Sequence, residues 1–138
     1  MPVIVEYNLR LARETEELEL DPETVRAGVQ AMFNESDKGV YYVAELDGKV
    51  VGQVMITYEW SDWRNGNIWW LQSVYVDPAY RRRGVFAELF KHVQRRCAAE
   101  KGSALRLYMH ADNARARACY GRVGMEETKY QVFEKSPL

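Results

Sequence analysis

Apolar residues recur along the chain with two different periods, and these periods predict the order of helices and strands. Spacings of three and four residues predict helices over residues 4–17, 22–34, 84–101 and 113–122. Asp21 and Pro22 supply an N-cap and a first-turn proline for the second of these helices. Alternating or short apolar runs between turn residues predict strands. The predicted strands cover residues 40–46, 49–59, 67–76, 104–110 and 129–134.

Two connections arrange the predicted strands into a sheet. Asp47-Gly48 lies between the first two strands and is typical of a hairpin turn. The strand ending at Val76, the helix opened by Gly84 and the strand beginning at Ala104 form a crossover, which places the two strands parallel. The predicted fold is α/β (α+β), with a mixed, mostly antiparallel twisted sheet, one parallel strand pair and about four flanking helices. We expect residues 1–138 to form a single domain.

Composition narrows the class of protein. A chain of 138 residues is long enough for one self-sufficient core, and no apolar run reaches the length of a membrane helix. Cys97 and Cys119 lie in helical patterns and lack the spacing of a disulfide or metal framework, so we expect free thiols. His92 and His110 are far apart in the sequence. We therefore expect a soluble, cytoplasmic protein without a metal site or a membrane partner.

The net charge of −1 hides an uneven distribution. Residues 1–62 hold 13 acidic and 5 basic residues, a net charge of −8, whereas residues 63–138 hold 7 acidic and 14 basic residues, a net charge of +7. Oppositely charged halves attract one another, but they also indicate different partners. The basic half is where we expect a phosphate-rich ligand.

The basic half contains the run YRRRGVFAELF, in which three arginines and Gly84 precede a predicted helix. A helix N-terminus carries about +0.5 of an elementary charge, so arginine is unfavourable there unless an anion is close. Gly84 lets the backbone approach a ligand, and the unpaired amides of a helix start bind phosphate. The alternative interpretation is a solvated basic turn.

Two motifs give the chain a resemblance to the GNAT superfamily of N-acetyltransferases. The superfamily's cofactor loop, R/Q-x-x-G-x-G/A after a strand, is matched from Arg81 to Val85 and is followed by Phe86 in place of Gly or Ala. The later motif, N-x-x-A-x-x-x-Y-x-x-x-G, is matched without a gap by Asn113, Ala116, Tyr120 and Gly124. The resemblance covers roughly residues 40–135.

The chain departs from the superfamily pattern in two places. Phe86 either closes the cofactor loop or points into the core, and we expect the core because Phe86, Leu89, Phe90 and Val93 form a helical apolar stripe. The superfamily's first strand would precede the first helix. Here residues 2–6 supply a short strand or the strand is missing.

The resemblance implies an enzyme that moves an acetyl group from acetyl-CoA to a primary amine by direct attack in a ternary complex. It implies that an amide near Val74 faces the thioester oxygen, and that Tyr120 is the general acid for the leaving thiolate. The residues that it places on acetyl-CoA are Val74, Tyr75, Val76, Arg81, Arg82, Arg83, Gly84, Val85, Phe86, Ala87, Asn113 and Tyr120.

The sequence signals for the general base and for the acceptor amine are weaker. Glu59 and Asp62 are the candidate bases, acting directly or through water, and for both a solvated surface carboxylate is the alternative. An acidic segment at residues 14–23 and a concentration of tryptophans favour a small cationic amine. The alternatives are a solvated acidic surface and a core or dimer-interface role for the tryptophans. The expected acceptor contacts are Glu14, Glu17, Trp60, Asp62, Trp63 and Gln72.

Three other functions compete with this one. The chain could acetylate a protein N-terminus or lysine, or it could be an acyl-CoA-binding module without catalysis. Nucleic-acid binding is disfavoured because the basic residues follow a cofactor motif and the pI is only about 6.2. The sequence leaves the identity of the amine and the oligomeric state open, with a homodimer as one candidate.

Overall fold

The computed structural model describes all residues from Met1 to Leu138 and divides into two compact units, Met1–Tyr108 and Met109–Leu138. The helices and strands of the first unit are α1 (Pro2–Glu16), α2 (Pro22–Asn34), β1 (Val40–Leu46), β2 (Lys49–Ser61), β3 (Gly66–Val76), α3 (Val85–Ala99) and β4 (Ala104–Leu107). The second unit contains α4 (Ala114–Arg122). That the two units form one domain stays a prediction.

The sheet of the first unit has the order β1-β2-β3-β4. The pairs β1–β2 and β2–β3 are antiparallel, whereas β3 and β4 are parallel, which confirms the predicted fold class. Asp47 and Gly48 join β1 to β2 with φ of 52° and 78°. Two consecutive positive φ values are what a tight hairpin turn of matching twist requires, which explains the strong signal of this dipeptide.

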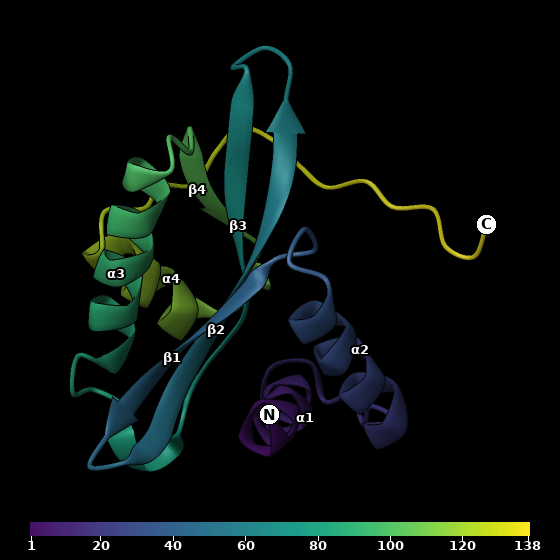
Figure 1. Cartoon of the computed structure of the whole chain (residues 1–138), viewed down its shortest axis with the longest axis vertical. Coiled ribbons are helices and arrows are strands. Elements are labelled where there is room, and N and C mark those ends of the chain that lie inside the picture. The colour runs from purple at the N-terminus through teal and green to yellow at the C-terminus, as the bar shows by residue number, and fades with distance from the viewer. The chain divides into compact units, whose positions relative to one another are not determined.

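Helices cover both faces of this sheet, α3 on one side and α1 with α2 on the other (Figure 1). The predicted apolar stripe of α3 is buried against the sheet, so the expectation for Phe86 is confirmed. Gly52 of β2 allows α3 to approach the sheet closely, because a Cβ built on Gly52 would lie only 2.9 Å from the Cγ1 atom of Val85. On the other face, Phe33 of α2 stacks on Tyr41 of β1, with ring centroids 5.9 Å apart.

Two segments considered as strands are helical or irregular. Residues 2–6 lie within α1, so of the two alternatives for the N-terminal strand the structure shows that the strand is missing; Pro2 occupies the first turn of this helix, a position that favours proline. Residues 129–134 form no strand either, although their sequence alternates. A strand needs a neighbouring strand for its backbone hydrogen bonds, and the second unit contains none. The large apolar side chains of this segment are exposed, as at Phe133.

No helix of the structure is long and apolar enough to cross a membrane. Both cysteines are free thiols, as expected, with Cys97 buried and Cys119 half-buried. Burial raises the pKa of the Cys97 thiol.

Candidate active site

A β-bulge interrupts β3 shortly before the strand ends at Val76. The register passes from the pair Gln53–Tyr75 to the pair Met55–Gln72, so one residue of β2 stands opposite two residues of β3, Ser73 and Val74. Ser73 has φ of 49°, in the left-handed region. Bulges of this kind redirect backbone groups and are frequent beside active sites. The bulge therefore sets the direction of the Val74 amide, the group expected to face a thioester oxygen.

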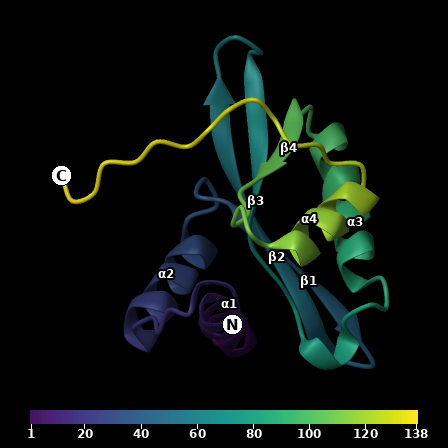
Figure 2. The same ribbon diagram turned by 180° about the vertical axis from the view of Figure 1, so that it is seen from behind.

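The same end of β3 has an open edge. The pairing of β3 with β4 ends at Leu71–Leu107, whereas β3 continues to Val76, as can be followed in Figure 2. The stretch from Val74 to Val76 thus has no neighbouring strand on the β4 side of the sheet. Backbone groups on such an edge can pair with an extended ligand. This is the stretch that the resemblance assigns to pantetheine.

The arginine loop leads from β3 into α3 through Gly84. Gly84 is the N-cap residue with φ of 79°, a conformation that favours glycine, and it provides no side-chain cap. The first backbone bond of α3 runs from Glu88 N to Gly84 O, so the preceding amides have no acceptor within the helix. A Cβ built on Gly84 would meet no atom within 4 Å. An open helix start with uncapped amides fits a diphosphate.

The three arginines of the loop have different surroundings. Arg81 is half-buried and bonded to the protein: its Nε donates to Val76 O at 2.9 Å, and one terminal nitrogen donates to Glu14 Oε1 at 2.7 Å. The guanidinium of Arg83 lies over the ring of Tyr80, 5.4 Å from the centroid. Arg82 is exposed, with φ of 65°. Arg82 and Arg83 are thus the more accessible of the three cations.

Glu14 joins α1 to this loop. Its carboxylate accepts hydrogen bonds from Arg81 and from the Tyr75 hydroxyl. Burial alone would raise the pKa of Glu14, but the hydrogen bonds from Tyr75 and Arg81 outweigh it, so the net pKa is lowered. Burial and the same carboxylate raise the pKa of Tyr75 to about 12. The negative charge of Glu14 is therefore balanced by Arg81, whereas Glu17, the other expected acceptor contact on this helix, is an exposed residue that follows its last turn.

Another group of side chains gathers on the face of β2 and β3 opposite to α3. Trp69 is buried against Tyr58 on the α3 face, and Trp70 points to the other face, as the alternation predicts. Trp70 donates from Nε1 to Glu59 Oε1 at 2.9 Å. The ring of Tyr108 stacks on Trp70 with a centroid distance of 4.5 Å. We call Glu59, Trp70 and Tyr108 the aromatic carboxylate cluster.

Sequence reasoning missed Tyr108 as a member of this cluster. The signal was present in the alternation of ALRLYMH, because Arg106 pairs with Trp70 in the parallel register and Tyr108 follows on the same face. Gln72 lies on this face too, and its Nε2 donates to Thr57 Oγ1 at 3.4 Å. The structure therefore brings together two expected site residues, Glu59 and Gln72, with one that was not expected.

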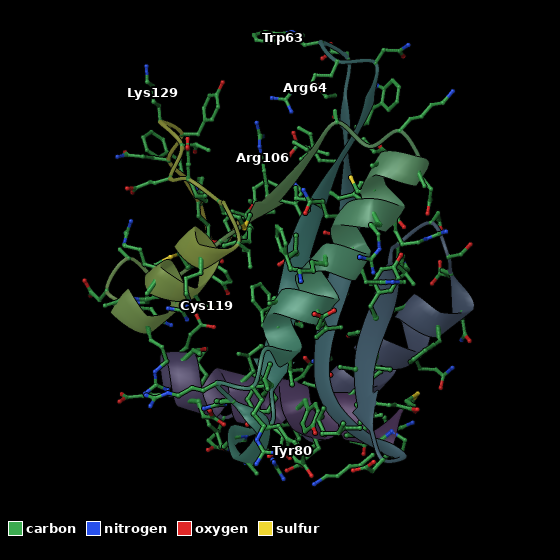
Figure 3. All side chains as sticks on the ribbon, turned by 90° about the vertical axis from the view of Figure 1, so that its left-hand side faces the viewer. Trp63, Arg64, Tyr80, Arg106, Cys119 and Lys129 are labelled. Carbon is green, nitrogen blue, oxygen red and sulfur yellow. The ribbon has the colours of Figure 1, made fainter.

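The remaining expected acceptor contacts lie at the end of the β2–β3 hairpin. Trp60 is 61% exposed and Trp63 is 94% exposed, and Asp62 between them is exposed too. Figure 3 shows Trp63 at the hairpin tip, at the opposite end of the sheet from Tyr80 beside the arginine loop. These three residues follow Glu59 closely, in the last residues of β2 and in the turn after it, and their side chains face solvent.

The second unit carries the later motif on α4. Asn113 is the N-cap of this helix, and its Oδ1 accepts from Ala116 N at 3.0 Å. Tyr120 is half-buried, and burial, together with the neighbouring Cys119, raises the pKa of its hydroxyl. A phenol with a raised pKa is fully protonated at neutral pH, which is the state that a general acid requires.

These features are those of an acetyltransferase fold, and comparison with known proteins agrees. The chain belongs to the acetyltransferase (GNAT) family, whose model matches residues 6–125. It is an acyltransferase of the N-acetyltransferase type, with a fold that binds acetyl-CoA.

Individual relatives support the assignment. The chain is 33% identical to the thialysine N-epsilon-acetyltransferase of Bos taurus over 132 residues, 86% of this chain and 76% of that protein. The crystal structure of a possible acetyltransferase from Clostridium difficile 630 has 43% identity and a TM-score of 0.92, covering 99% of this chain and 91% of that one. AAC(6')-Iy in complex with the bisubstrate analogue CoA-S-monomethyl-acetylneamine has the same fold, with a TM-score of 0.77 at 21% identity, covering 99% and 93%.

Proposed function

We propose that the protein transfers the acetyl group of acetyl-CoA to the primary amine of a small cationic acceptor in a ternary complex. The observation that carries the proposal is the aromatic carboxylate cluster, which lies on the sheet face opposite to α3. A carboxylate attracts an ammonium group by its charge, and ring faces attract the same group through their quadrupoles. The similarity to the thialysine N-epsilon-acetyltransferase of Bos taurus supports the proposal, because thialysine offers a side-chain amine.

The arginine loop and the open edge of β3 are the proposed holding sites for acetyl-CoA. The amides from Arg82 to Ala87 would hold the diphosphate, with Arg82 and Arg83 adding charge-assisted contacts. The edge from Val74 to Val76 would pair with pantetheine, and Asn113 stays a predicted contact of the cofactor. When bound, acetyl-CoA supplies an activated carbonyl carbon. The Val74 amide would stabilise negative charge on the carbonyl oxygen, as preorganised donors do.

Glu59 is the proposed proton acceptor. A protonated amine cannot attack a carbonyl carbon, so the proton must leave before or during the attack. The Glu59 carboxylate is fixed by the Trp70 indole through one oxygen, which leaves the other to face an ammonium group or a bridging water. Glu17, Trp60, Asp62 and Trp63 would then contribute mainly to attraction of a second positive charge on the acceptor.

The acceptor class is tested with a pair of amines that differ in one charge. Pentylamine and 1,5-diaminopentane have the same carbon chain, but only the diamine carries a second ammonium group. We expect the diamine and lysine to be acetylated with kcat/KM at least about 10-fold above that of pentylamine, which is about 1.4 kcal/mol. The difference should shrink at high salt, because salt screens exposed charges. The measurement is release of the CoA thiol.

Variants separate the acceptor class from the reaction class. Glu59→Gln should reduce kcat for every amine, while Glu45→Gln, an exposed carboxylate of β1, serves as the matched control and should leave it unchanged. Equal kcat/KM for pentylamine and the diamine would contradict the cationic preference. If no amine released CoA although acetyl-CoA bound, the proposed acceptor class as a whole would be wrong.

Tyr120 is the proposed general acid for the thiolate of CoA. Tyr120→Phe keeps the ring and removes the proton, so turnover should fall by about 10²–10⁴-fold while the affinity for acetyl-CoA is retained. The control is Tyr130→Phe, an exposed tyrosine of the same unit. Turnover of Tyr120→Phe within a few-fold of the parent would show that solvent or another group protonates the thiolate.

A further inference from the structure

Gln53 is the one polar residue in the buried core of the protein. Its exposure is 0%, and it lies in the middle of β2, beside strand residues that are apolar and equally buried, such as Val51 and Val54. Its Oε1 atom has no hydrogen-bond partner. A buried polar group without a partner costs stability, and an apolar residue of similar size would avoid that cost. A glutamine at this position therefore indicates a role beyond packing.

The hydrogen bonds of Gln53 reach the bulge of β3. Its Nε2 donates to Ser73 O at 3.1 Å and to Asn8 Oδ1 at 2.9 Å. A backbone carbonyl can only accept, so the amide orientation with Nε2 toward Ser73 is the one that the bond requires. Asn8 in turn lies on α1, and its Nδ2 faces the Tyr41 hydroxyl at 3.4 Å. The bulge is thus fixed to α1 through two side-chain amides.

The carbonyl that Gln53 holds belongs to a particular peptide unit. Ser73 C=O and Val74 N–H are the two ends of one peptide bond, and in a planar trans peptide they point in opposite directions. A donor that fixes the direction of the carbonyl therefore fixes the direction of the Val74 N–H as well. It also withdraws electron density from the carbonyl, which makes the N–H a stronger donor.

We infer that Gln53 is a positioning residue for acetyl transfer, which aims and polarises the Val74 amide from the opposite side of the peptide unit. The inference rests on the proposed function, in which that amide faces the carbonyl oxygen of acetyl-CoA. The role needs a side chain that is buried, long enough to cross from β2 to β3 and able to donate. It also explains why Ser73, a residue with a Cβ, is kept in the left-handed region: the Gln53 bond holds the unfavourable conformation in place.

The main test is Gln53→Met, which keeps the length and approximate volume of the side chain but removes both donors. We expect kcat to fall by about 10- to 100-fold, somewhat less than the roughly 10²–10³-fold that follows outright loss of a donor to a developing oxyanion. The affinity for acetyl-CoA, measured by calorimetry, should change by less than about 3-fold, because the loop and the strand edge remain. Asn8→Ala, which leaves the Ser73 bond intact, should show a smaller loss of kcat in the same direction.

A second measurement reports the hydrogen bond from the Val74 amide directly and does not depend on turnover. Isotope-edited infrared spectroscopy of bound acetyl-CoA reports the carbonyl stretching frequency, which falls when the oxygen accepts a strong hydrogen bond. The parent protein should shift this band to lower frequency, and Gln53→Met should lose most of the shift. Val29→Ala is the matched control for destabilisation, because Val29 is a buried residue of α2 outside the site. It should unfold at lower temperature and retain both kcat and the shift.

The outcomes separate this inference from the proposed function. If the parent shifts the carbonyl band and Gln53→Met shifts it equally, with normal kcat, Gln53 has no positioning role and the inference fails alone. If the parent shows no shift at all, the proposed role of the Val74 amide fails. A Gln53→Met variant that does not fold is replaced by Gln53→Glu, whose buried carboxyl should be protonated and donate one hydrogen bond. That variant should keep part of the shift at low pH and lose it as the carboxyl ionises; a shift independent of pH and equal to the parent's would contradict the inference.

Discussion

The two faces of the sheet are built from different kinds of contact. On the α3 face, apolar side chains pack without polar partners, as at Leu89 and Val93. On the α1 face, polar side chains bridge the helix to the strands: Asn8 with Gln53, and Glu14 with Tyr75 and Arg81. The first face depends on shape and area, which many sequences can supply, whereas the second depends on directed hydrogen bonds, which only a few residues can supply. We therefore expect truncation of apolar side chains on the α3 face to change stability alone, whereas removal of the Gln53 hydrogen bonds on the α1 face should change chemistry as well.

Leu89→Ala should have the largest effect on stability. Leu89 is buried in α3, and truncation of such a residue costs about 2–5 kcal/mol because a cavity remains. Chemical denaturation measures the free energy of unfolding. At a temperature where the variant is still folded, kcat should match that of the parent, and a large loss of kcat in the folded variant would contradict the division between the faces.

Gly84→Asp tests the point where the α3 face meets the proposed cofactor site. Aspartate adds a negative charge where a diphosphate is expected and disfavours the positive φ of this residue. We expect the affinity for acetyl-CoA, measured by calorimetry, to fall by at least about 100-fold, or about 2.7 kcal/mol. Circular dichroism should show a folded protein. Unchanged affinity in the folded variant would remove the loop from the site.

The Glu14 ion pair gives the α1 face a pH dependence. The pKa of Glu14 is lowered in the folded protein, so its contribution to stability is complete above the unfolded pKa of about 4.3. That contribution is lost as the pH falls through the lower folded value. Glu14→Gln should lower the free energy of unfolding by about 1 kcal/mol at neutral pH, since the pair is partly exposed. The variant should also lose less of its free energy of unfolding than the parent as the pH falls. If the variant and the parent lose the same amount in acid, other carboxylates cause the loss.

Gly28→Ala should have the smallest effect, with the opposite sign. Gly28 lies inside α2, and a Cβ there would meet no atom within 4 Å. Alanine is more favourable than glycine within a helix by about 0.5–1 kcal/mol. The midpoint temperature of thermal unfolding should therefore rise slightly, and kcat should not change. A loss of activity in this variant would mean that α2 contributes to the site.

The contrast between the faces also explains what the sequence could predict. Apolar periodicity is a local signal, so the α3 stripe, the hairpin turn at Asp47-Gly48 and the parallel pair of β3 and β4 were predicted correctly. The GNAT motifs are local too, and Gly84 and Asn113 start α3 and α4 as expected. The acetyltransferase class followed from these short segments.

The α1 face could not be predicted in the same way, because its contacts join distant parts of the chain. Arg81 and Glu14 are 67 residues apart, and nothing in either segment indicates the other. The bulge at Ser73 has no sequence signal either, since a non-glycine residue with positive φ looks like any other strand residue. The strand expected at residues 129–134 failed for a related reason: alternation describes a segment, but a strand also requires a partner.

The tryptophans of β2 and β3 have a spectroscopic consequence. Trp69 is 3% exposed and Trp63 is 94% exposed, with Trp70 held by Glu59 between these extremes. Iodide in solution should therefore quench the red-edge emission of Trp63 and leave the blue emission of Trp69 nearly untouched. With Trp60 and Trp63 replaced by phenylalanine, the remaining signal would be dominated by Trp69 and Trp70, and acceptor binding beside Glu59 would become visible as a change in Trp70 emission alone.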